Sequence, residues 1–365
     1  MRTVRVAVAG AGAFGRNHLR VYRELEASGL PVALAGAVEP DAARAAETAA
    51  KYSIHVFPSV EELLSADLRL DAASVAVPTV HHHAVALTLL DAGLDLLVEK
   101  PLAATLAEAD ELLALAERKS RILQPGHLER FNPAVLAVQP KLRRPMFFEA
   151  HRLSIFTPRS LDVDVVLDLM IHDLDIVLTF ANSSVREVRA VGLPILSPKV
   201  DIANVRVEFE SGCVANFTAS RVSTERVRKL RFFEPRQYVS IDYAWRDLLV
   251  IRLDGSVPPE IAAALEGGQI DPAILAQLAA AGAGPGPNPG LSIAKPPVLP
   301  GEPLRLEIES FLESVRTRQA PRVTARQGRD ALALALEIQA SMASHAVRAG
   351  LQDFFEPPAA GANLA

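Results

Sequence analysis

The chain has 365 residues, of which half are hydrophobic and 22% are charged, and its net charge is −5 at pH 7. The length exceeds one comfortable hydrophobic core, so two domains are expected, and the charge gives no reason to expect nucleic acid or an acidic membrane surface as a partner. The single Cys213 excludes an internal disulfide, no apolar run reaches transmembrane length, and the N-terminus lacks the apolar region and cleavage site of a signal peptide. We therefore expect a cytoplasmic protein without a membrane partner.

Strands and helices alternate through the first third of the chain. Apolar runs predict strands at 4–9, 32–38, 71–77, 95–100 and 121–126, and a helical pattern follows each of the first four. This alternation predicts an α/β fold with a parallel sheet that has helices on both faces. We assign this first domain to residues 1–124.

After about residue 126 the pattern becomes typical of antiparallel strands. The predicted strands are 145–151, 204–210, 213–219 and 238–242. In 204–210, Val205, Val207 and Phe209 alternate with charged residues, which indicates one packed and one polar face. The sequence therefore predicts a second, α+β domain over residues 125–350 with an open, mostly antiparallel sheet. It includes a Pro/Gly/Ala-rich excursion at 254–304 and helices at 304–318 and 324–348, and a tail follows at 351–365.

The stretch GAGAFG lies directly after the first predicted strand and opens a helix. Gly10, Gly12 and Gly15 have the spacing that allows a tight turn, a close approach of the backbone to a pyrophosphate, and close packing of helix on strand. Glu39, at the end of the second strand, is placed to accept hydrogen bonds from an adenosine ribose and would repel a 2′-phosphate. These features predict NAD as the cofactor, whereas a purely structural glycine turn is the alternative.

Two further segments carry candidate catalytic side chains. Lys100 ends the predicted strand 95–100, directly before Pro101, at the carboxyl edge of the sheet where ligands sit in open α/β folds. In the apolar stretch VVLDLMIHDLDIVL (165–178), Asp168, His172 and Asp175 have i, i+4 and i+7 spacing and would share one face of a helix. Alone, Lys100 would be read as a solvated strand-end lysine, and the Asp168–His172 pair as a helix contact of a few tenths of a kcal/mol.

The chain resembles the Gfo/Idh/MocA oxidoreductases, relatives of glucose–fructose oxidoreductase and inositol dehydrogenase. The matching segments occur in the order and spacing of that family, and they are GAGAFG (10–15), VPTVHHH (77–83), VEKPLA (98–103), GHLERFNPA (126–134) and DLMIHDLD (168–175). The resemblance implies an N-terminal Rossmann domain, a C-terminal α+β domain, and an open sheet that commonly mediates oligomerisation. A homodimer or homotetramer is therefore expected. Met170 departs from the family, in which many members have glycine there.

The resemblance also implies roles for individual residues. Lys100 would be the catalytic lysine, His172 the general acid/base, and Asp168 its partner. The residues implied for cofactor binding are Gly10, Gly12, Ala13, Phe14, Gly15, Glu39, Pro78, Thr79, His82, Glu99, Lys100 and Arg130. The residues implied for substrate binding are Lys100, His127, Asn132, Arg152, Arg159 and His172. An imidazole suits proton transfer near neutral pH because its ordinary pKa is about 6.5.

A finer similarity involves GHLERFNPA and residues 151–175, which are similar to nucleotide-sugar members that oxidise the 3-hydroxyl of UDP-N-acetylglucosamine to a ketone for lipid A biosynthesis. Several basic residues can supply charge for a diphosphate: Arg152, Arg159, Arg221, Arg226, Arg228, Lys229 and Arg231. A charged sheet face or a subunit contact is an equally good interpretation of any one of them.

Other functions remain open at this point. One is the oxidation of a free polyol of the inositol type, and another is a non-catalytic sensor that binds NAD, because fold alone does not dictate function. A metal site at the three histidines 81–83 is disfavoured, since consecutive residues on a turn point in different directions and no cysteine or carboxylate lies nearby at zinc-ligand spacing. We expect no metal.

Overall fold

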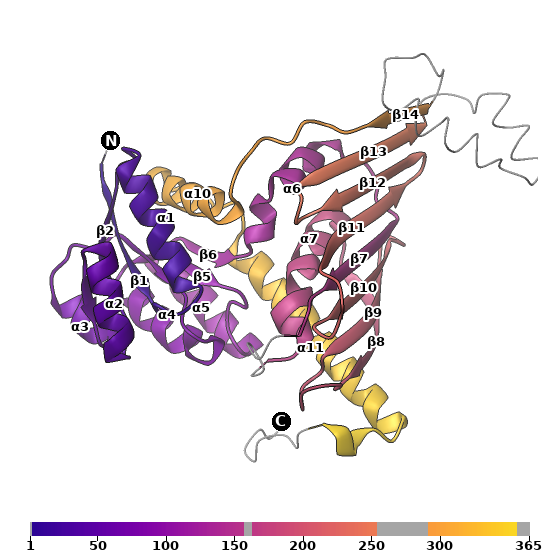
Figure 1. Ribbon diagram of the computed structural model, residues 1–365, viewed down its shortest axis with the longest axis horizontal. Coiled ribbons are helices and arrows are strands. Elements are labelled where there is room, and N and C mark those ends of the chain that lie inside the picture. Colours follow the sequence, from indigo (N-terminus) through magenta and orange to yellow (C-terminus); the bar gives the residue numbers. More distant parts are fainter. Residues whose placement is uncertain (1, 157–162, 254–290, 356–365) are drawn as a thin grey trace, which may run out of the picture. The chain divides into compact units, whose positions relative to one another are not determined.

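The computed structural model describes residues 2–156, 163–253 and 291–355, and the chain divides into two compact units (Figure 1). One unit contains Met1–Phe131 and Gly301–Leu336, and the other contains Asn132–Pro300 and Glu337–Ala365. The division expected from the sequence differs, because it placed residues 125–131 and 301–336 in the second domain. The physical reason is hydrophobic: the helix that begins at Pro303 buries its apolar side in the core of the first unit.

The first unit is built on a six-stranded parallel sheet with the order β3-β2-β1-β4-β5-β6. Its strands are β1 (Val4–Ala9), β2 (Val32–Val38), β3 (His55–Phe57), β4 (Ala72–Val75), β5 (Asp95–Glu99) and β6 (Leu123–Gly126). Its helices are α1 (Gly15–Ala27), α2 (Ala42–Tyr52), α3 (Val60–Ser65), α4 (His82–Asp91), α5 (Leu106–Lys119) and α10 (Pro303–Thr317), with 3₁₀ turns η1 (Thr79–His81) and η2 (Leu128–Phe131). This arrangement confirms the predicted Rossmann-type domain.

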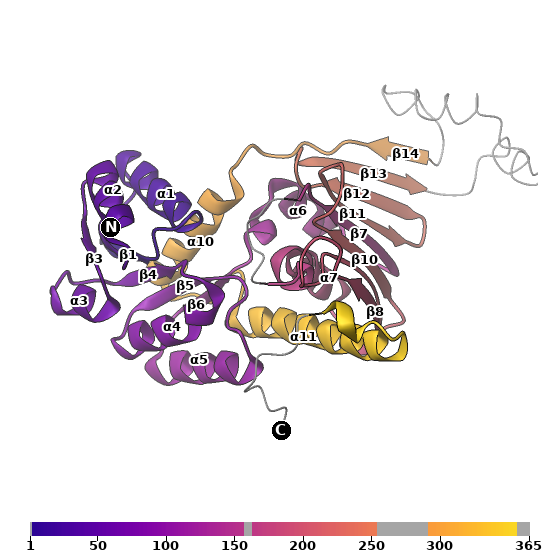
Figure 2. The same cartoon turned by 60° about the horizontal axis from the view of Figure 1, so that its bottom comes forward.

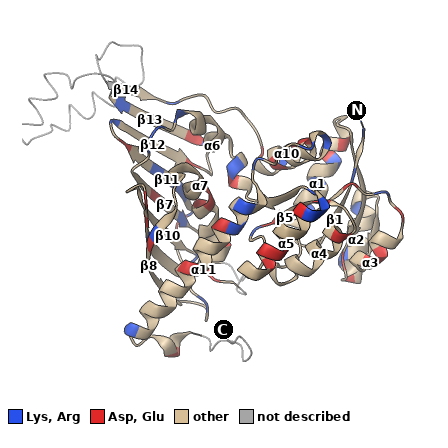
Figure 3. Cartoon of the chain, turned by 180° about the vertical axis from the view of Figure 1, so that it is seen from behind, with Lys and Arg blue, Asp and Glu red and all other residues tan. Residues whose placement is uncertain are grey.

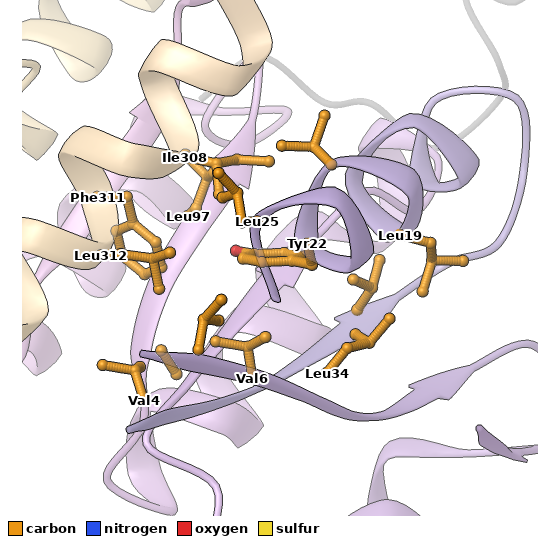
Figure 4. Close-up of a cluster of buried hydrophobic side chains, with 14 of the residues drawn as sticks. Val4, Val6, Leu19, Tyr22, Leu25, Leu34, Leu97, Ile308, Phe311 and Leu312 are labelled. Atoms are coloured by element: carbon orange, nitrogen blue, oxygen red, sulfur yellow. The ribbon is translucent and has the colours of Figure 1, made fainter. Parts of the chain in front are cut away.

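Helices α1 and α10 seal one face of this sheet (Figure 4). Ile308, Phe311 and Leu312 of α10 are fully buried among residues of β1, β2 and α1. Tyr22 of α1 lies in the same cluster, and its hydroxyl is 2.8 Å from Ser74 Oγ, which satisfies two buried polar groups. The C-terminal part of the chain therefore completes the hydrophobic core of the N-terminal domain.

The second unit contains an eight-stranded sheet with the order β14-β13-β12-β11-β7-β10-β9-β8. Its strands are β7 (Phe147–Leu153), β8 (Val185–Leu193), β9 (Ile202–Phe209), β10 (Val214–Ser220), β11 (Val227–Glu234), β12 (Gln237–Asp242), β13 (Asp247–Leu253) and β14 (Leu291–Ala294). Neighbouring strands are antiparallel except for the parallel pair β7 and β10. The predicted open, mostly antiparallel sheet is confirmed.

Helices cover one face of this sheet (Figure 2). They are α6 (Pro133–Val138), α7 (Ile171–Ala181) and the last part of α11 (Ala325–Arg348), and the short turns are η3 (Gln139–Lys141), η4 (Val166–Met170) and η5 (Gln352–Phe354). Phe180 of α7 packs edge-on against Phe232 of β11, with 6.0 Å between ring centroids. On β9, Val205, Val207 and Phe209 are buried and face these helices, as their alternation predicted.

The surface charges of both units are mixed in sign. In Figure 3 the basic and acidic residues are interspersed along the ribbons of α1, α5 and α10. No helix in the described parts of the chain is long and apolar enough to cross a membrane.

Candidate active site

The glycine turn between β1 and α1 has the geometry that its spacing predicts. Gly10 has φ +94°, and an added Cβ there would lie 2.7 Å from the carbonyl oxygen of Ala76, while one at Gly15 would overlap the carbonyl oxygen of Gly10. A Cβ at Gly12 would meet nothing within 4 Å. Phe14 provides no side-chain cap for α1, and backbone bonds close its first turn instead: Arg16 N–H donates to the Gly12 carbonyl oxygen at 3.1 Å, and Asn17 N–H donates to that of Phe14 at 2.9 Å. Gly10 and Gly15 shape the turn, and Gly12 leaves room beside it.

Glu39 lies beside this turn with its carboxylate held in place. Ala11 N–H donates to Oε2 at 3.1 Å, and Asp41 N–H and Arg44 Nη2 each donate to Oε1 at 3.0 Å. Burial opposes ionisation of Glu39, but the bonds from Arg44, Asp41 and Ala11 outweigh it and lower its pKa. The ion pair with exposed Arg44 was not predicted from the sequence, in which the two residues stand five positions apart.

A cleft of about 640 Å³ opens along the carboxyl ends of β1, β2 and β4. Gly10, Gly12, Glu39 and Pro78 are among its lining residues, together with Arg44 and Thr88, which were not predicted. The cleft therefore has the carboxylate for a ribose, the glycine turn for a pyrophosphate, and mostly apolar walls for an adenine ring. These residues fit a dinucleotide such as NAD.

Glu99 and Lys100 follow directly from β5. Glu99 is 6% exposed, and its Oε1 lies 2.8 Å from Nε2 of His18, a fully buried residue of α1. An added Cβ at Gly126 would lie 3.0 Å from the Glu99 carboxyl group, so this glycine gives the Glu99 side chain its space against β6. Sequence reasoning missed His18, although its position three residues after Gly15 on the opening helix was a usable signal.

His82 is buried at 1% exposure and connects two loops at this edge of the sheet. Its Nδ1 lies 2.7 Å from the carbonyl oxygen of Pro101, and its Nε2 lies 2.9 Å from that of Val77. Burial lowers the pKa of His82, whereas the two carbonyl contacts oppose that shift. Of its neighbours implied for cofactor binding, Pro78 lines the cleft and Thr79 begins η1.

Two further predicted residues lie at the end of the first sheet. His127 is 1% exposed and follows β6, and Arg130 is 4% exposed in η2. Arg322 lies near Arg130: burial, followed by the Arg130 charge, lowers the pKa of Arg322. Arg322 was not predicted, because it lies 192 positions after Arg130 in the chain.

Asp168 and His172 lie in the second unit, at the junction of two helical forms. Asp168 is in a π-helical turn, η4, and His172 is in the first turn of α7. The prediction of one regular helix over 165–178 is therefore wrong at its start, because a π turn takes up more residues than an α turn. Both residues are half-buried, whereas Asp175, on the same predicted face, is buried at 2% exposure.

The start of this helical segment is anchored by polar contacts. Asp164 Oδ1 accepts hydrogen bonds from the N–H groups of Val166 and Leu167 at 2.9 and 3.1 Å, and its Oδ2 accepts one from Gln339 of α11 at 2.6 Å. Arg221 donates to the carbonyl oxygen of Val163 at 2.9 Å. The backbone that carries Asp168 is therefore fixed from three directions.

Arg152 and Asn132, both predicted to bind substrate, are tied to neighbours within the second unit. Arg152 is 4% exposed and donates to both carboxylate oxygens of Asp173, at 2.7 and 3.0 Å. Its guanidinium also lies over the Tyr243 ring, 5.1 Å from the centroid. Asn132 caps α6 through the N–H of Ala134 and donates to the Tyr243 carbonyl oxygen at 3.1 Å.

The candidate residues are thus divided between the units. The first unit contains Lys100, the glycine turn, Glu39 and the other predicted residues up to Arg130. The second unit contains Asp168, His172, Arg152 and Asn132. Arg159 lies outside the described residues. The described residues contain no cluster of three or more His, Cys, Asp or Glu side chains that could hold a metal ion.

The fold and the cleft define a dinucleotide-binding oxidoreductase of the Rossmann class, with a second α+β domain. Residues 4–127 match the oxidoreductase family with an NAD-binding Rossmann fold, and residues 135–235 match the GFO/IDH/MocA C-terminal domain. The chain belongs to the Gfo/Idh/MocA oxidoreductase family, and its cofactor is NAD.

Individual relatives extend this comparison over most of the chain. A UDP-N-acetylglucosamine 3-dehydrogenase from Acidithiobacillus ferrooxidans is 34% identical over 341 residues, which cover 93% of this chain and 97% of that protein. Its solved structure superposes with a TM-score of 0.80 over 94% of this chain and 99% of that chain. An inositol 2-dehydrogenase from Acidothermus cellulolyticus is 30% identical, but over 52% of this chain and 57% of that protein. A levoglucosan dehydrogenase in complex with NADH shares the fold, with a TM-score of 0.77 at 16% identity.

Proposed function

We propose that the protein oxidises the 3-hydroxyl group of UDP-N-acetylglucosamine to a ketone, with NAD⁺ as the oxidant. The observation that carries this proposal is the 34% identity to a UDP-N-acetylglucosamine 3-dehydrogenase over nearly the whole of both chains. Similarity to the inositol dehydrogenase from Acidothermus cellulolyticus covers only about half of the chain and supports that alternative less well.

The reaction breaks one C–H bond and one O–H bond of the sugar. The hydride goes to the nicotinamide ring, and the hydroxyl proton must go to a protein group or to water. We assign proton acceptance to His172 and the holding of the reacting oxygen to Lys100. Asp168 is assigned the positioning of the His172 imidazole, from its place four residues earlier on the same helical segment.

The assigned cofactor residues are those that line or form the cleft of the first unit. Gly10, Gly12 and Gly15 would leave the backbone of the turn open to the pyrophosphate, and the fixed Glu39 carboxylate would accept hydrogen bonds from the adenosine ribose. The negative charge of Glu39 and its pairing with Arg44 both disfavour the 2′-phosphate of NADP. This is the basis for NAD rather than NADP as the working cofactor.

The deciding experiment measures NADH formation by the purified full-length protein with separate candidate substrates. We expect turnover with UDP-N-acetylglucosamine and NAD⁺, little with free glucose or myo-inositol, and a loss of at least about 100-fold in kcat for His172→Ala. Turnover of inositol but not of the nucleotide sugar would establish the polyol alternative. If NAD binds and none of these substrates reacts, a non-catalytic sensor becomes the better interpretation.

We further infer self-association through the uncovered face of the eight-stranded sheet, as a homodimer or homotetramer. On that face, Phe147 stacks on Phe233 with 5.4 Å between centroids, and Phe233 lies 5.2 Å from Tyr238, all three half-buried. Aromatic side chains gathered on an open sheet face are typical of a subunit interface. The compartment that fits a reaction using the cellular NAD pool is the cytoplasm, and a role in lipid A assembly follows only if the nucleotide sugar is the substrate.

A further inference from the structure

The basic residues near β11 differ sharply in whether a partner already neutralises them. Arg152 and Arg221 are buried in ion pairs with Asp173 and Asp201. Arg231 is paired with Glu149 at 3.1 Å, and Lys229 lies 3.7 Å from Asp242. Arg226 and Arg228, by contrast, are exposed and have no ion pair within the described part of the chain, and the same holds for Arg246. Only this last group has charge available for a ligand.

Arg228 faces the helix-covered side of the sheet. Its neighbours at even positions of β11, Leu230 and Phe232, are fully buried against the helices, and side chains two residues apart share a face of a strand. Arg228 pairs in register with Arg152 of β7, and its carbonyl oxygen accepts a hydrogen bond from the N–H of Tyr243 at 2.9 Å. Arg228 therefore stands in one row with Arg152 and Tyr243.

The turn that follows β12 presents an aromatic ring to solvent beside this row. Trp245 is 84% exposed, although its turn is well ordered by hydrogen bonds. Asp242 Oδ1 accepts from the N–H groups of Ala244 and Trp245 at 3.1 Å, and buried Tyr243 is anchored by Asn132 and Arg152. A large apolar ring held in water on a fixed turn is well suited to stack on a flat ligand.

This end of the sheet also carries the start of the helical segment that contains Asp168 and His172. β12 ends there at Asp242, and β9 begins there after Val200, whose carbonyl oxygen accepts a hydrogen bond from Val165 N–H at 3.0 Å. Asp173, next to His172, is bound by Arg152, the register partner of Arg228. A ligand that extends from Trp245 past Arg228 would therefore point toward α7.

We propose that Trp245 and Arg228 form a subsite for a nucleoside diphosphate, with the base stacked on Trp245 and the diphosphate held by Arg228. Arg226 and Arg246 add positive charge at its rim. This proposal rests on the proposed function, because it assigns the nucleotide part of the sugar nucleotide to the second unit. Aromatic faces stack on bases of any kind, and guanidinium groups bind phosphate oxygens strongly.

The chain contains a single tryptophan, so the fluorescence of the NAD⁺-saturated protein reports on this turn alone. We expect UDP to quench the Trp245 emission in a saturable manner and UMP to act more weakly, while N-acetylglucosamine should have no effect. Arg228→Gln should weaken the UDP response about tenfold or more, because a charged hydrogen bond is lost. Arg231→Gln is the matched control: it removes an arginine from the same strand on the opposite face, and UDP binding should not change.

Kinetics separate this subsite from the proposed reaction. With UDP-N-acetylglucosamine, Trp245→Ala and Arg228→Gln should raise KM about tenfold or more and leave kcat within about twofold, whereas Trp245→Phe should restore a near-normal KM. Turnover with an unchanged KM in Trp245→Ala and Arg228→Gln would overturn the subsite and leave the proposed function standing. Saturable quenching by UDP without any turnover would overturn the function and leave the subsite standing. A fluorescence change that follows protein concentration rather than UDP would assign Trp245 to a subunit contact and overturn the subsite.

Discussion

Arg152 of β7 and Asp173 of α7 form a buried, bidentate ion pair, with N–O distances of 2.7 and 3.0 Å. Both side chains are less than 5% exposed. The pair ties the sheet to the helix that carries His172, one residue before Asp173. Arg152, which the sequence suggested as a positively charged substrate-binding residue, thus fixes the helix that carries the candidate catalytic residue His172.

Removal of one partner of this pair should be strongly destabilising. Arg152→Met leaves the Asp173 carboxylate buried without its main counter-charge, and we expect a loss of about 3–5 kcal/mol in the free energy of unfolding. The double variant Arg152→Met/Asp173→Leu removes both charges and should regain most of that loss. Urea unfolding of the two variants checks this. Equal stability of the single and double variants would show that the charge left behind is not the cause.

The Glu39–Arg44 pair leads to a prediction about cofactor choice. Glu39→Ala removes the carboxylate that repels a 2′-phosphate and frees Arg44 to bind one. We expect the ratio of kcat/KM for NADP⁺ to that for NAD⁺ to rise about tenfold or more, which corresponds to roughly 1.4 kcal/mol. Steady-state kinetics with both cofactors measure this ratio. The double variant Glu39→Ala/Arg44→Ala is the control, and it should lose the gain for NADP⁺ if Arg44 is responsible.

His82 makes the stability of the first unit dependent on pH. Burial lowers its pKa; the carbonyl groups of Pro101 and Val77 and the charge of Glu99 oppose the shift, and the charge of Lys100 supports it. At a pH between the two pKa values, His82 therefore binds a proton in the unfolded chain but not in the folded chain. The contribution of neutral His82 to the free energy of unfolding is complete above about pH 6.5 and decreases as the pH falls toward the lowered pKa of the folded state. For one proton, the slope cannot exceed about 1.4 kcal/mol per pH unit.

The measurement for His82 is urea unfolding at a series of pH values between about 7.5 and 5.5. His82→Gln cannot titrate and should show a flatter dependence than the parent protein, even if it is less stable throughout because a hydrogen bond is lost. An identical slope in the parent protein and in His82→Gln would exclude His82 as the source.

Five of the six strands of the first sheet could be predicted because each is a short apolar run, and a helical pattern follows four of them; β3 (His55–Phe57), which has three residues, was missed. In the second sheet, four strands were missed although the open sheet itself was predicted: β8 (Val185–Leu193), β11 (Val227–Glu234), β13 (Asp247–Leu253) and β14 (Leu291–Ala294). In β11 the charges of Lys229 and Arg231 lie on the uncovered face, and they hid the buried alternation of Leu230 and Phe232. A run of charges on one face of a strand is easily read as a solvated segment.

The local features of the site could be predicted from the sequence, whereas the ion pairs between its side chains could not. The glycine turn and Glu39 follow from positions relative to one strand and one helix. The partners of Arg152 and Arg221 lie about twenty residues away in the chain, and strand register and packing select them. Helical periodicity also could not predict the π turn that contains Asp168, because the prediction assumed a regular α-helical spacing from the first residue of the segment.

The final prediction separates the structural and ligand-facing glycines of the turn. Gly12→Ala introduces a Cβ that meets no neighbour within 4 Å, so we expect the free energy of unfolding to stay within about 0.5 kcal/mol of the parent value. The methyl group enters the space assigned to the pyrophosphate, and the KM for NAD⁺ should rise about tenfold or more. Gly15→Ala is the contrasting variant: its Cβ would overlap the Gly10 carbonyl oxygen, and the protein should be destabilised by several kcal/mol even without cofactor. Thermal unfolding with and without NAD⁺, together with the KM, tests both. If Gly12→Ala bound NAD⁺ as tightly as the parent protein, the pyrophosphate would have to lie elsewhere.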